Sequence, residues 1–322
     1  MPRGEPPSSI VGRVEDVVQL MPAGIITIGD ARRVGLDPRR LYGAERRGAL
    51  ARVRPGAFVR AAEWAGMTPE ARQVVRVRAA ARALHDPVFS HESAAAVWGM
   101  PLLGDVAEVH VVRPRARGGS SWPGVVQHQR AGEPRAVRHD GVLVTPLIQT
   151  VLDLAATRQF AEAVVVADHA LRSGLLTVDA LVSAATDGRA RRGGGRALVV
   201  ARFADARAES PGESLSRARI HELGLPAPAL QTRLRDGDGV VGRVDFWWDR
   251  IRLVGEFDGR VKYRAGGVDD RRPPEERLWA EKLREDRLRA AGARVARWTW
   301  ADALDRDRLA AVLARAGLRR SG

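Results

Sequence analysis

The stretch VVGRVDFWWDRIRLVGEFDG, residues 240–259, decides the fold of the last third of this 322-residue chain. Its two β-branched and aromatic runs are typical of strands, and the short DR between them predicts a tight connection. Ten residues separate Asp245 in the first run from Glu256 in the second. Adjacent antiparallel strands would bring these two carboxylates side by side, and Asp258 would share the strand face of Glu256.

The clustered acids predict a cation site. Carboxylates held close together repel, and each raises the pKa of the other unless a cation lies among them. Oxygen ligands of this kind suit Mg²⁺ or Mn²⁺, which beside a phosphate activates water and stabilises developing charge. A lysine would add a point charge at the same phosphate. The chain contains only two lysines, Lys262 and Lys282, and both follow this stretch.

The flanking sequence completes a pattern of helices and strands around the acids. Ser210 predicts the start of a helix with Glu213 in its first turn. A strand through Gln231 leads into a hairpin turn at DGDG (236–239). After residue 259 come a long helix, a further strand and a terminal helix over 301–318, so that the predicted order is α-β-β-β-α-β-α.

This order, together with RVDFWWDRIRLVGEFDG (243–259), resembles the PD-(D/E)XK nuclease superfamily, which has the restriction-endonuclease-like fold. Within it, the sequence is most similar to the branch related to very-short-patch repair endonucleases. The resemblance implies that Asp245 and Glu256 bind metal, with Asp258 as a further ligand. It also implies that Glu213 joins the site and that Gln231 occupies a polar position of the same branch.

The sequence departs from this family at one position. The usual lysine, two residues after the second acid, is replaced here by Asp258. Lysines of this superfamily can come from neighbouring elements, so Lys262 or Lys282 is expected to contact phosphate as a catalytic residue. Arg284 and Arg287 are alternatives for the same role.

Each of these residues also has a purely structural interpretation. Glu213 could compensate the helix dipole, and Lys282 could be a solvated helix residue. The tryptophans could pack in the core or stack on bases. Asp245 and Glu256 could instead pair with an arginine on the sheet face, and the nearby ones are Arg243, Arg252 and Arg294.

Residues 10–60 have the order of a helix-turn-helix unit followed by a hairpin. Thr27 or Asp30 is expected to cap a short helix, and Asp37 with Pro38 to begin a second one. The turn RPGA then joins two strands like a wing. Between residues 24 and 60 nine arginines oppose three acids, a net charge of +6. The alternative is a three-helix scaffold with a solvated face.

GIITIGDARRVGLDPRRLYGAERRGALARVRPGAFV (24–59) resembles the N-terminal domain of AbiEi-type antitoxins, and SHESAAAVWGMPLLG (90–104) and VTPLIQTVLDLAA (144–156) extend the similarity. The resemblance implies a winged-helix transcriptional regulator of a toxin–antitoxin system. Its partners would be double-stranded DNA and a cognate toxin. The residues expected to contact DNA are five arginines, namely Arg39, Arg40, Arg46, Arg47 and Arg54.

Composition limits the remaining possibilities. The net charge of +14 favours a polyanionic partner, although an arginine-rich genome would give the same excess. The absence of cysteine excludes disulfides and cysteine-based zinc sites. No apolar stretch approaches the length of a membrane span, and no secretion signal begins the chain, so we expect a cytoplasmic protein. The scattered His110, His128 and His139 are expected to be structural or surface residues rather than metal ligands.

The sequence therefore predicts an α+β multidomain protein. A winged helix-turn-helix occupies 1–60, a mixed α/β middle region 61–208, and a restriction-endonuclease-like αβββαβ domain 209–322. The expected function is DNA binding with metal-dependent endonuclease activity, a phosphodiester hydrolysis. One alternative is a non-catalytic, antitoxin-like regulator, and another is a structural module that binds neither metal nor DNA.

Overall fold

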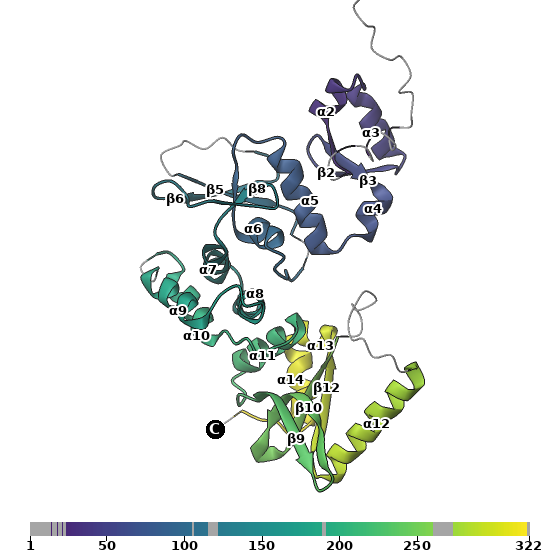
Figure 1. Ribbon diagram of the computed structural model, residues 1–322, viewed down its shortest axis with the longest axis vertical. Coiled ribbons are helices and arrows are strands. Elements are labelled where there is room, and N and C mark those ends of the chain that lie inside the picture. Colours follow the sequence, from purple (N-terminus) through teal and green to yellow (C-terminus); the bar gives the residue numbers. More distant parts are fainter. Residues whose placement is uncertain are drawn as a thin grey trace, which may run out of the picture. The chain divides into compact units, whose positions relative to one another are not determined.

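Two segments of the chain, Met1–Leu154 and Ala155–Gly322, form separate units in the computed structural model (Figure 1). Both predicted domain boundaries, after residues 60 and 208, fall inside these units. The structure describes residues 14, 18, 21, 24–104, 106–114, 122–188, 191–259 and 273–320, without the side chains of 274, 277, 278, 280 and 281.

The first helices of unit one begin where the sequence predicts. Thr27 caps α2 (Ile28–Arg33) through a capping box, in which Asp30 bonds back to the Thr27 backbone. Asp37 caps α3 (Pro38–Arg46) by accepting a hydrogen bond from a backbone N–H of its first turn. Of the two caps that the sequence allowed, Thr27 and Asp30, the structure therefore has Thr27.

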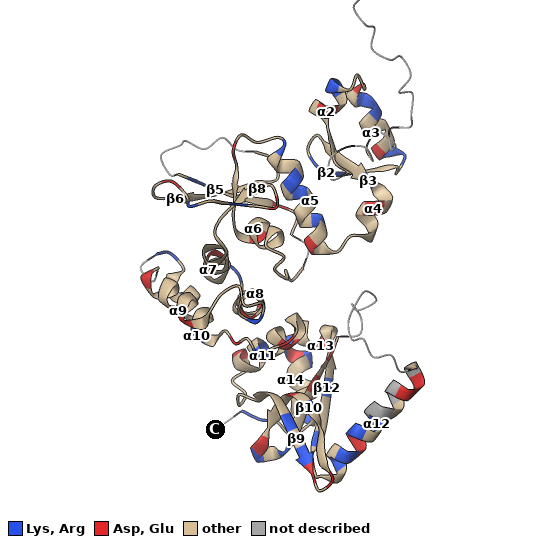
Figure 2. Cartoon of the chain, viewed as in Figure 1, with Lys and Arg blue, Asp and Glu red and all other residues tan. Residues whose placement is uncertain are grey.

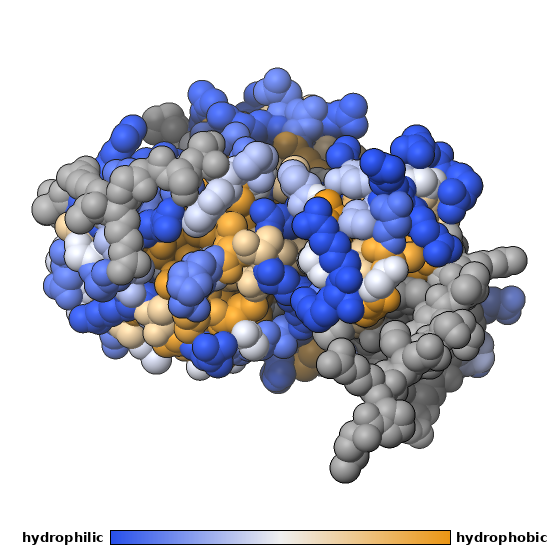
Figure 3. All heavy atoms as spheres, turned by 90° about the horizontal axis from the view of Figure 1, so that it is seen from above, coloured by the Kyte–Doolittle hydropathy of each residue, from blue (hydrophilic) through white to orange (hydrophobic). Residues whose placement is uncertain are grey.

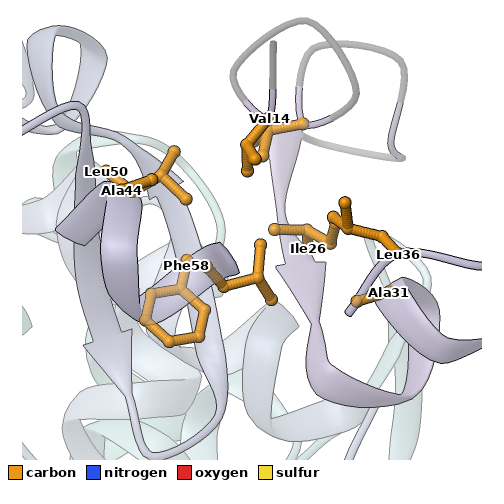
Figure 4. Close-up of a cluster of buried hydrophobic side chains, with 9 residues drawn as sticks. Val14, Ile26, Ala31, Leu36, Ala44, Leu50 and Phe58 are labelled. Carbon is orange, nitrogen blue, oxygen red and sulfur yellow. The ribbon is translucent and has the colours of Figure 1, made fainter. Parts of the chain in front are cut away.

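A small sheet packs with these helices in the order β1-β3-β2, and β2 and β3 form the predicted antiparallel hairpin. Its strands are β1 (Ile26–Thr27), β2 (Leu50–Arg54) and β3 (Ala57–Arg60). Helices and sheet enclose one apolar cluster, whose side chains point toward one another in Figure 4. The cluster consists of Val14, Val18, Ile26, Ala31, Leu36, Leu41, Ala44, Leu50 and Phe58.

The rest of unit one is a five-stranded mixed sheet in the order β6-β5-β4-β8-β7, with helices around it. Its strands are β4 (Val88–Phe89), β5 (Val109–Pro114), β6 (Val125–Arg130), β7 (Val137–His139) and β8 (Val142–Val144). The helices of this stretch of the chain are α5 (Pro69–Ala81), α6 (His91–Val97) and α7 (Leu147–Thr157), which runs past the end of unit one, and α4 (Ala61–Gly66), whose Trp64 packs with β2 and β3 instead.

Helix α5 joins the parts of unit one that lie on either side of residue 60. Val75 and Ala79 pack in a cluster with residues of β2 and β3. Val77 and Ala80 pack in a different cluster with residues of β4 and β5. Since one helix is shared by two apolar clusters, the hairpin and the larger sheet belong to one unit.

Unit two begins with three helices that the sequence assigned to the middle region, namely α8 (Phe160–Arg172), α9 (Val178–Asp187) and α10 (Gly194–Phe203). They are followed by α11 (Pro211–Glu222), the predicted first helix of the C-terminal domain. Asp168 of α8 is fully buried and accepts two hydrogen bonds from Arg217 of α11, at 2.8 and 2.9 Å. Removing one partner of a buried ion pair strongly destabilises a fold. The packing of α8 and that of α11 therefore depend on each other.

The sheet of unit two has the order β12-β11-β10-β9, with β9, β10 and β11 antiparallel and β12 parallel to β11. Its strands are β9 (Ala229–Asp236), β10 (Gly239–Trp248), β11 (Leu253–Asp258) and β12 (Arg294–Thr299). Its remaining helices are α12 (Pro274–Ala290), α13 (Trp300–Leu304) and α14 (Arg306–Arg315). The predicted order of elements is therefore present.

The terminal helix differs from its prediction as a single element. Asp305 ends α13 and caps α14, because its carboxylate accepts hydrogen bonds from the backbone of Asp307 and Arg308. A side chain that satisfies helix N–H groups favours a new start over continuation.

The two faces of this sheet carry different helices. A Cβ on Gly212 of α11 would lie 2.0 Å from the Phe257 ring, so α11 packs directly on that face of β11. Glu256 points to the opposite face, where Arg284 of α12 contacts it. Three buried tryptophans, Trp247, Trp248 and Trp298, pack against the sheet as the packing interpretation predicted.

Most of the molecular face in Figure 3 is hydrophilic, with apolar residues visible between the polar ones. In the described part of the chain, none of the helices combines the length and hydropathy needed to cross a membrane.

Candidate functional site

Glu213 is fixed by the first turn of α11. Ser210 caps this helix, and its hydroxyl donates to Glu213 Oε1 at 2.7 Å. The Glu209 N–H donates to Glu213 Oε2 at 2.9 Å. The residue is only 8 % exposed. Glu213 thus completes the helix start and at the same time presents a buried carboxylate to the sheet.

Gln231 of β9 connects Glu213 to the second acid. Its amide nitrogen donates to Glu213 Oε2 at 2.8 Å, and its side chain also hydrogen-bonds Asp245. Its φ of 52° lies in the left-handed region, which costs a non-glycine residue roughly 1–2 kcal/mol. Residues held in this conformation concentrate at functional sites.

Asp245 lies on β10, one residue before Phe246. Phe246 and Gly255 are the paired residues of β10 and β11 that lie nearest to it. Its Oδ2 accepts a hydrogen bond from the Phe257 N–H at 2.9 Å. Burial, and then the Glu213 carboxylate, raise the pKa of Asp245 to about 7, and Glu256 adds to the effect. The predicted crowding of carboxylates is therefore present in the structure.

Glu256 of β11 is held by two arginines. Arg284 of α12 donates to Oε1 at 2.5 Å, and Arg297 of β12 lies 3.3 Å from Oε2. Arg297 is the register partner of Glu256 in the parallel pairing of β11 with β12. The arginines suggested as structural partners have other partners: Arg243 pairs with Glu209, and Arg252 and Arg294 donate to backbone carbonyls.

A pocket of about 260 Å³ opens on the α12 face of the sheet. Three arginines and three acids line it together with one aromatic residue, whose ring packs on α11 at the other face of the sheet. They are Arg243, Arg284, Arg297, Asp245, Glu256, Asp258 and Phe257. The three acids of the quoted stretch therefore lie in one pocket, as their spacing predicted.

The two lysines have different outcomes. Lys262 lies outside the described residues. Lys282 is exposed on α12, with its Nζ 5.6 Å from the centre of the Trp279 ring, and it is not among the described residues that line the pocket. A phosphate contact by either lysine stays a prediction. Arg284, one of the suggested alternatives, does line the pocket, whereas Arg287 pairs with Asp236.

No group of three or more His, Asp or Glu side chains in the described part of the chain is arranged to hold a metal ion. In the acidic site this agrees with the contacts, because both oxygens of Glu256 are already held by guanidinium groups.

The predicted DNA-contacting arginines of unit one divide into two groups. Four are exposed on α3 or directly after it, where Figure 2 shows blue residues: Arg39, Arg40, Arg46 and Arg47. Arg54 is half-buried, and its Nη1 donates to the Ala79 carbonyl of α5 at 3.4 Å. Burial lowers the pKa of Arg54. Its guanidinium therefore contributes to packing on α5.

Three histidines that are distant in sequence lie together in unit one. The ring of His91 stacks on His128 with centroids 3.5 Å apart, and His128 Nε2 lies 3.0 Å from His110 Nδ1. Glu92 Oε2 is 3.3 Å from the same His110 nitrogen. Burial lowers the pKa of His91 to about 2 and that of His128 to about 4, with neighbouring histidines adding to both shifts.

No pattern in the sequence predicts this histidine cluster. His110 and His128 lie on β5 and β6, which pair in parallel, so their contact depends on a register that spacing along the chain does not specify. His139, the third histidine considered, instead stacks on Trp98.

No protein-family model matches the chain. Two proteins of Mycobacterium tuberculosis are each 34% identical to it over 193 residues, which are 60% of this chain and 69% of theirs. They are the uncharacterized protein MT2308 of strain CDC 1551 / Oshkosh and the uncharacterized protein Rv2248 of strain ATCC 25618 / H37Rv. The chain belongs to the family of these two proteins.

Proposed function

We propose that this protein binds DNA and that its second unit is a metal-dependent phosphodiesterase. The observation that carries the proposal is the site around Asp245. Burial first, and then the nearby acids Glu213 of α11 and Glu256 of β11, raise the pKa of Asp245 on β10 to about 7. A fold gains nothing in stability from such crowding, whereas metal sites for phosphoryl chemistry depend on it.

The arrangement of elements supports the same proposal. Unit two has a helix, three antiparallel strands, a second helix, and a strand parallel to the third. This is the order of the restriction-endonuclease-like fold, to which the sequence also has a resemblance. Since one fold can carry several functions, the proposed function rests on the acidic residues of the site and not on the topology.

The donor set fits Mg²⁺ or Mn²⁺ in its chemistry, because the acids that line the pocket offer hard oxygen ligands. Asp245 and Glu256 would hold the ion, with Asp258 as a further ligand. When bound, the ion supplies the charge that activates water and stabilises the leaving oxygen. Gln231, which Glu213 holds by accepting its amide hydrogen bond, orients the Asp245 carboxylate.

The arginine-rich start of unit one supports the DNA-binding half of the proposal. The exposed guanidinium groups of α3 are suited to phosphate contacts, which dominate the affinity of most DNA-binding proteins. A capped helix pair followed by a hairpin is the order of a winged helix-turn-helix.

Cleavage assays with matched variants test the enzyme. Full-length protein is incubated with single- and double-stranded DNA and with Mg²⁺ or Mn²⁺. We expect metal-dependent cleavage that falls by about 10²-fold or more in Asp245→Asn and in Glu256→Gln. Asp249→Asn, an exposed acid in the turn between the same two strands, is the control and should cleave normally. Equal cleavage by Asp245→Asn and wild type would refute the proposed site.

A second candidate function is a regulator that binds DNA without cutting it. It is favoured by one observation, namely that Arg284 and Arg297 already neutralise Glu256. This candidate predicts salt-sensitive binding to a promoter site that survives Asp245→Asn but is lost when Arg39, Arg40, Arg46 and Arg47 are replaced together. A cognate toxin is then the expected protein partner.

A further inference from the structure

The two guanidinium groups contact Glu256 in a partly buried site and not at the open surface. The Arg284 side chain is 20 % exposed, that of Arg297 33 %, and that of Glu256 15 %. Arg284 approaches β10 at Gly242, where a Cβ would lie 3.1 Å from the Arg284 Cδ. The absence of a side chain at Gly242 therefore gives the Arg284 stem its path to the pocket.

The charges around the pocket are balanced as they stand. Its three arginines oppose its three acids, so the formal charge of the lining is zero when all six are ionised. A divalent cation adds two positive charges and needs an oxygen of Glu256 that a guanidinium now holds. The balance is restored if the displaced guanidinium groups take an anion.

Phosphate is the anion that these groups suit. Guanidinium binds phosphate oxygens through paired, charge-assisted hydrogen bonds, and it does so with the same donors that it offers to a carboxylate. A guanidinium group released from Glu256 can bind a phosphodiester that enters the same pocket, and Arg297 keeps a second carboxylate partner in Glu285 at 3.1 Å.

We infer that Arg284 and Arg297 are phosphate-binding residues that Glu256 holds until a divalent cation takes its carboxylate. This inference rests on the proposed metal site. It makes cation binding and nucleic-acid binding cooperative, because each ligand frees the groups that the other uses. By linkage, DNA must tighten cation binding by the factor by which the cation tightens DNA binding.

Calorimetric titration of the full chain with Mn²⁺ tests the coupling without measuring activity. For wild type we expect a short phosphorothioate DNA duplex to tighten Mn²⁺ binding by about tenfold or more. For Arg284→Gln/Arg297→Gln we expect tighter binding of Mn²⁺ alone, by about fivefold or more, and almost no effect of the duplex.

Arg219→Gln is the matched control. It removes a similarly buried ion pair, with Glu222 at 2.8 Å, in the last turn of α11 outside the pocket lining. It should behave as wild type in both titrations. Asp245→Asn should lose the Mn²⁺ binding in every background.

The outcomes separate this inference from the proposed function. If Mn²⁺ binds in an Asp245-dependent way but neither the duplex nor the double variant changes its affinity, the inference is overturned and the metal site stands. If no variant binds Mn²⁺ through Asp245, both are overturned. Coupled binding without any DNA cleavage supports the inference and removes the phosphodiesterase.

Discussion

The carboxyl group of Asp245 serves the proposed metal site as a carboxylate, but its ionisation destabilises the fold. Its pKa in the fold is about 7, whereas the ordinary value is 3.8. The folded protein therefore holds a proton at Asp245 that the unfolded chain loses as pH rises above 4. Folding stability falls as pH rises from about 4 to 7, because ionising this group is unfavourable in the fold.

Asp245→Asn should for this reason be more stable than wild type in alkaline buffer. We expect a gain in unfolding free energy of roughly 1–4 kcal/mol at pH 8 that vanishes near pH 4. Urea titrations across this range measure it, with Asp249→Asn as the control that should show no such trend. A variant that is less stable than wild type at pH 8 would contradict the assignment.

The histidine cluster predicts the opposite pH dependence for unit one. The pKa of His91, about 2, and that of His128, about 4, lie below the ordinary 6.5. Unfolding therefore takes up protons below pH 6.5, and stability falls as pH decreases toward 4. The facing charged groups are His110, Glu92 and Arg130.

His128→Asn should weaken this acid sensitivity. We expect the loss of unfolding free energy between pH 6.5 and 4.5 to shrink by roughly 1–3 kcal/mol, because one proton fewer is taken up. His85→Gln is the control, since that side chain is 99% exposed. The interpretation fails if both variants show the pH dependence of wild type.

At the scale of elements, the contact between α11 and β11 positions the acids. Gly212→Ala would place a Cβ 2.0 Å from the Phe257 ring, so the helix must move away from the strand. We expect a loss of about 1–3 kcal/mol in unfolding free energy and, since Glu213 follows directly, a displaced carboxylate. Thermal unfolding measures the first effect and Mn²⁺ titration the second.

Gly195→Ala provides the comparison for this helix contact. Gly195 lies in the first turn of α10, and a Cβ there would meet no atom within 4 Å. That change should be neutral or slightly stabilising. A partial rescue of Gly212→Ala by Phe257→Leu would locate the damage in this contact, whereas equal effects of the two glycine variants would exclude it.

The sequence predicted elements well where the signal is local. The caps at Asp37 and Ser210 and the hairpins through RPGA and DGDG depend on neighbouring residues, and all are present. The approach of Asp245 to Glu256 followed from one short connection between strands. These features need no knowledge of distant pairing.

What the sequence missed depends on long-range register. Arg297 meets Glu256 only because β12 pairs in parallel with β11 at one register, after the intervening helix α12. His110 meets His128 for the same kind of reason. Similarly, Arg54 is partly covered by α5, where its partner Ala79 lies twenty-five residues further along the chain. Periodicity within a segment carries no information about such contacts.

At the scale of the whole molecule, we expect the net charge of +14 to attract DNA mainly at the exposed arginines of α3. Replacing Arg39, Arg40, Arg46 and Arg47 by Gln should lower DNA affinity and flatten its dependence on salt. Each lost phosphate contact should reduce the slope of log affinity against log salt by about 0.9. Fluorescence anisotropy at several salt concentrations measures both.

Arg54→Gln separates charge from packing in this experiment. Because Arg54 is half-buried against α5, its loss should lower the unfolding temperature of unit one and leave the salt slope nearly unchanged. A slope reduced as much by Arg54→Gln as by the α3 replacements would show that the contacts to DNA lie elsewhere.

The ion pair between Asp168 and Arg217 determines which fragment of the chain can fold by itself and so be exchanged between proteins as a module. A gene fragment beginning at residue 209 would encode Arg217 without its buried partner. We expect that fragment to be insoluble and a fragment from residue 155 to give the circular dichroism of a folded protein. Recombination in this family should therefore exchange the acidic site only together with the helices from α8 onward.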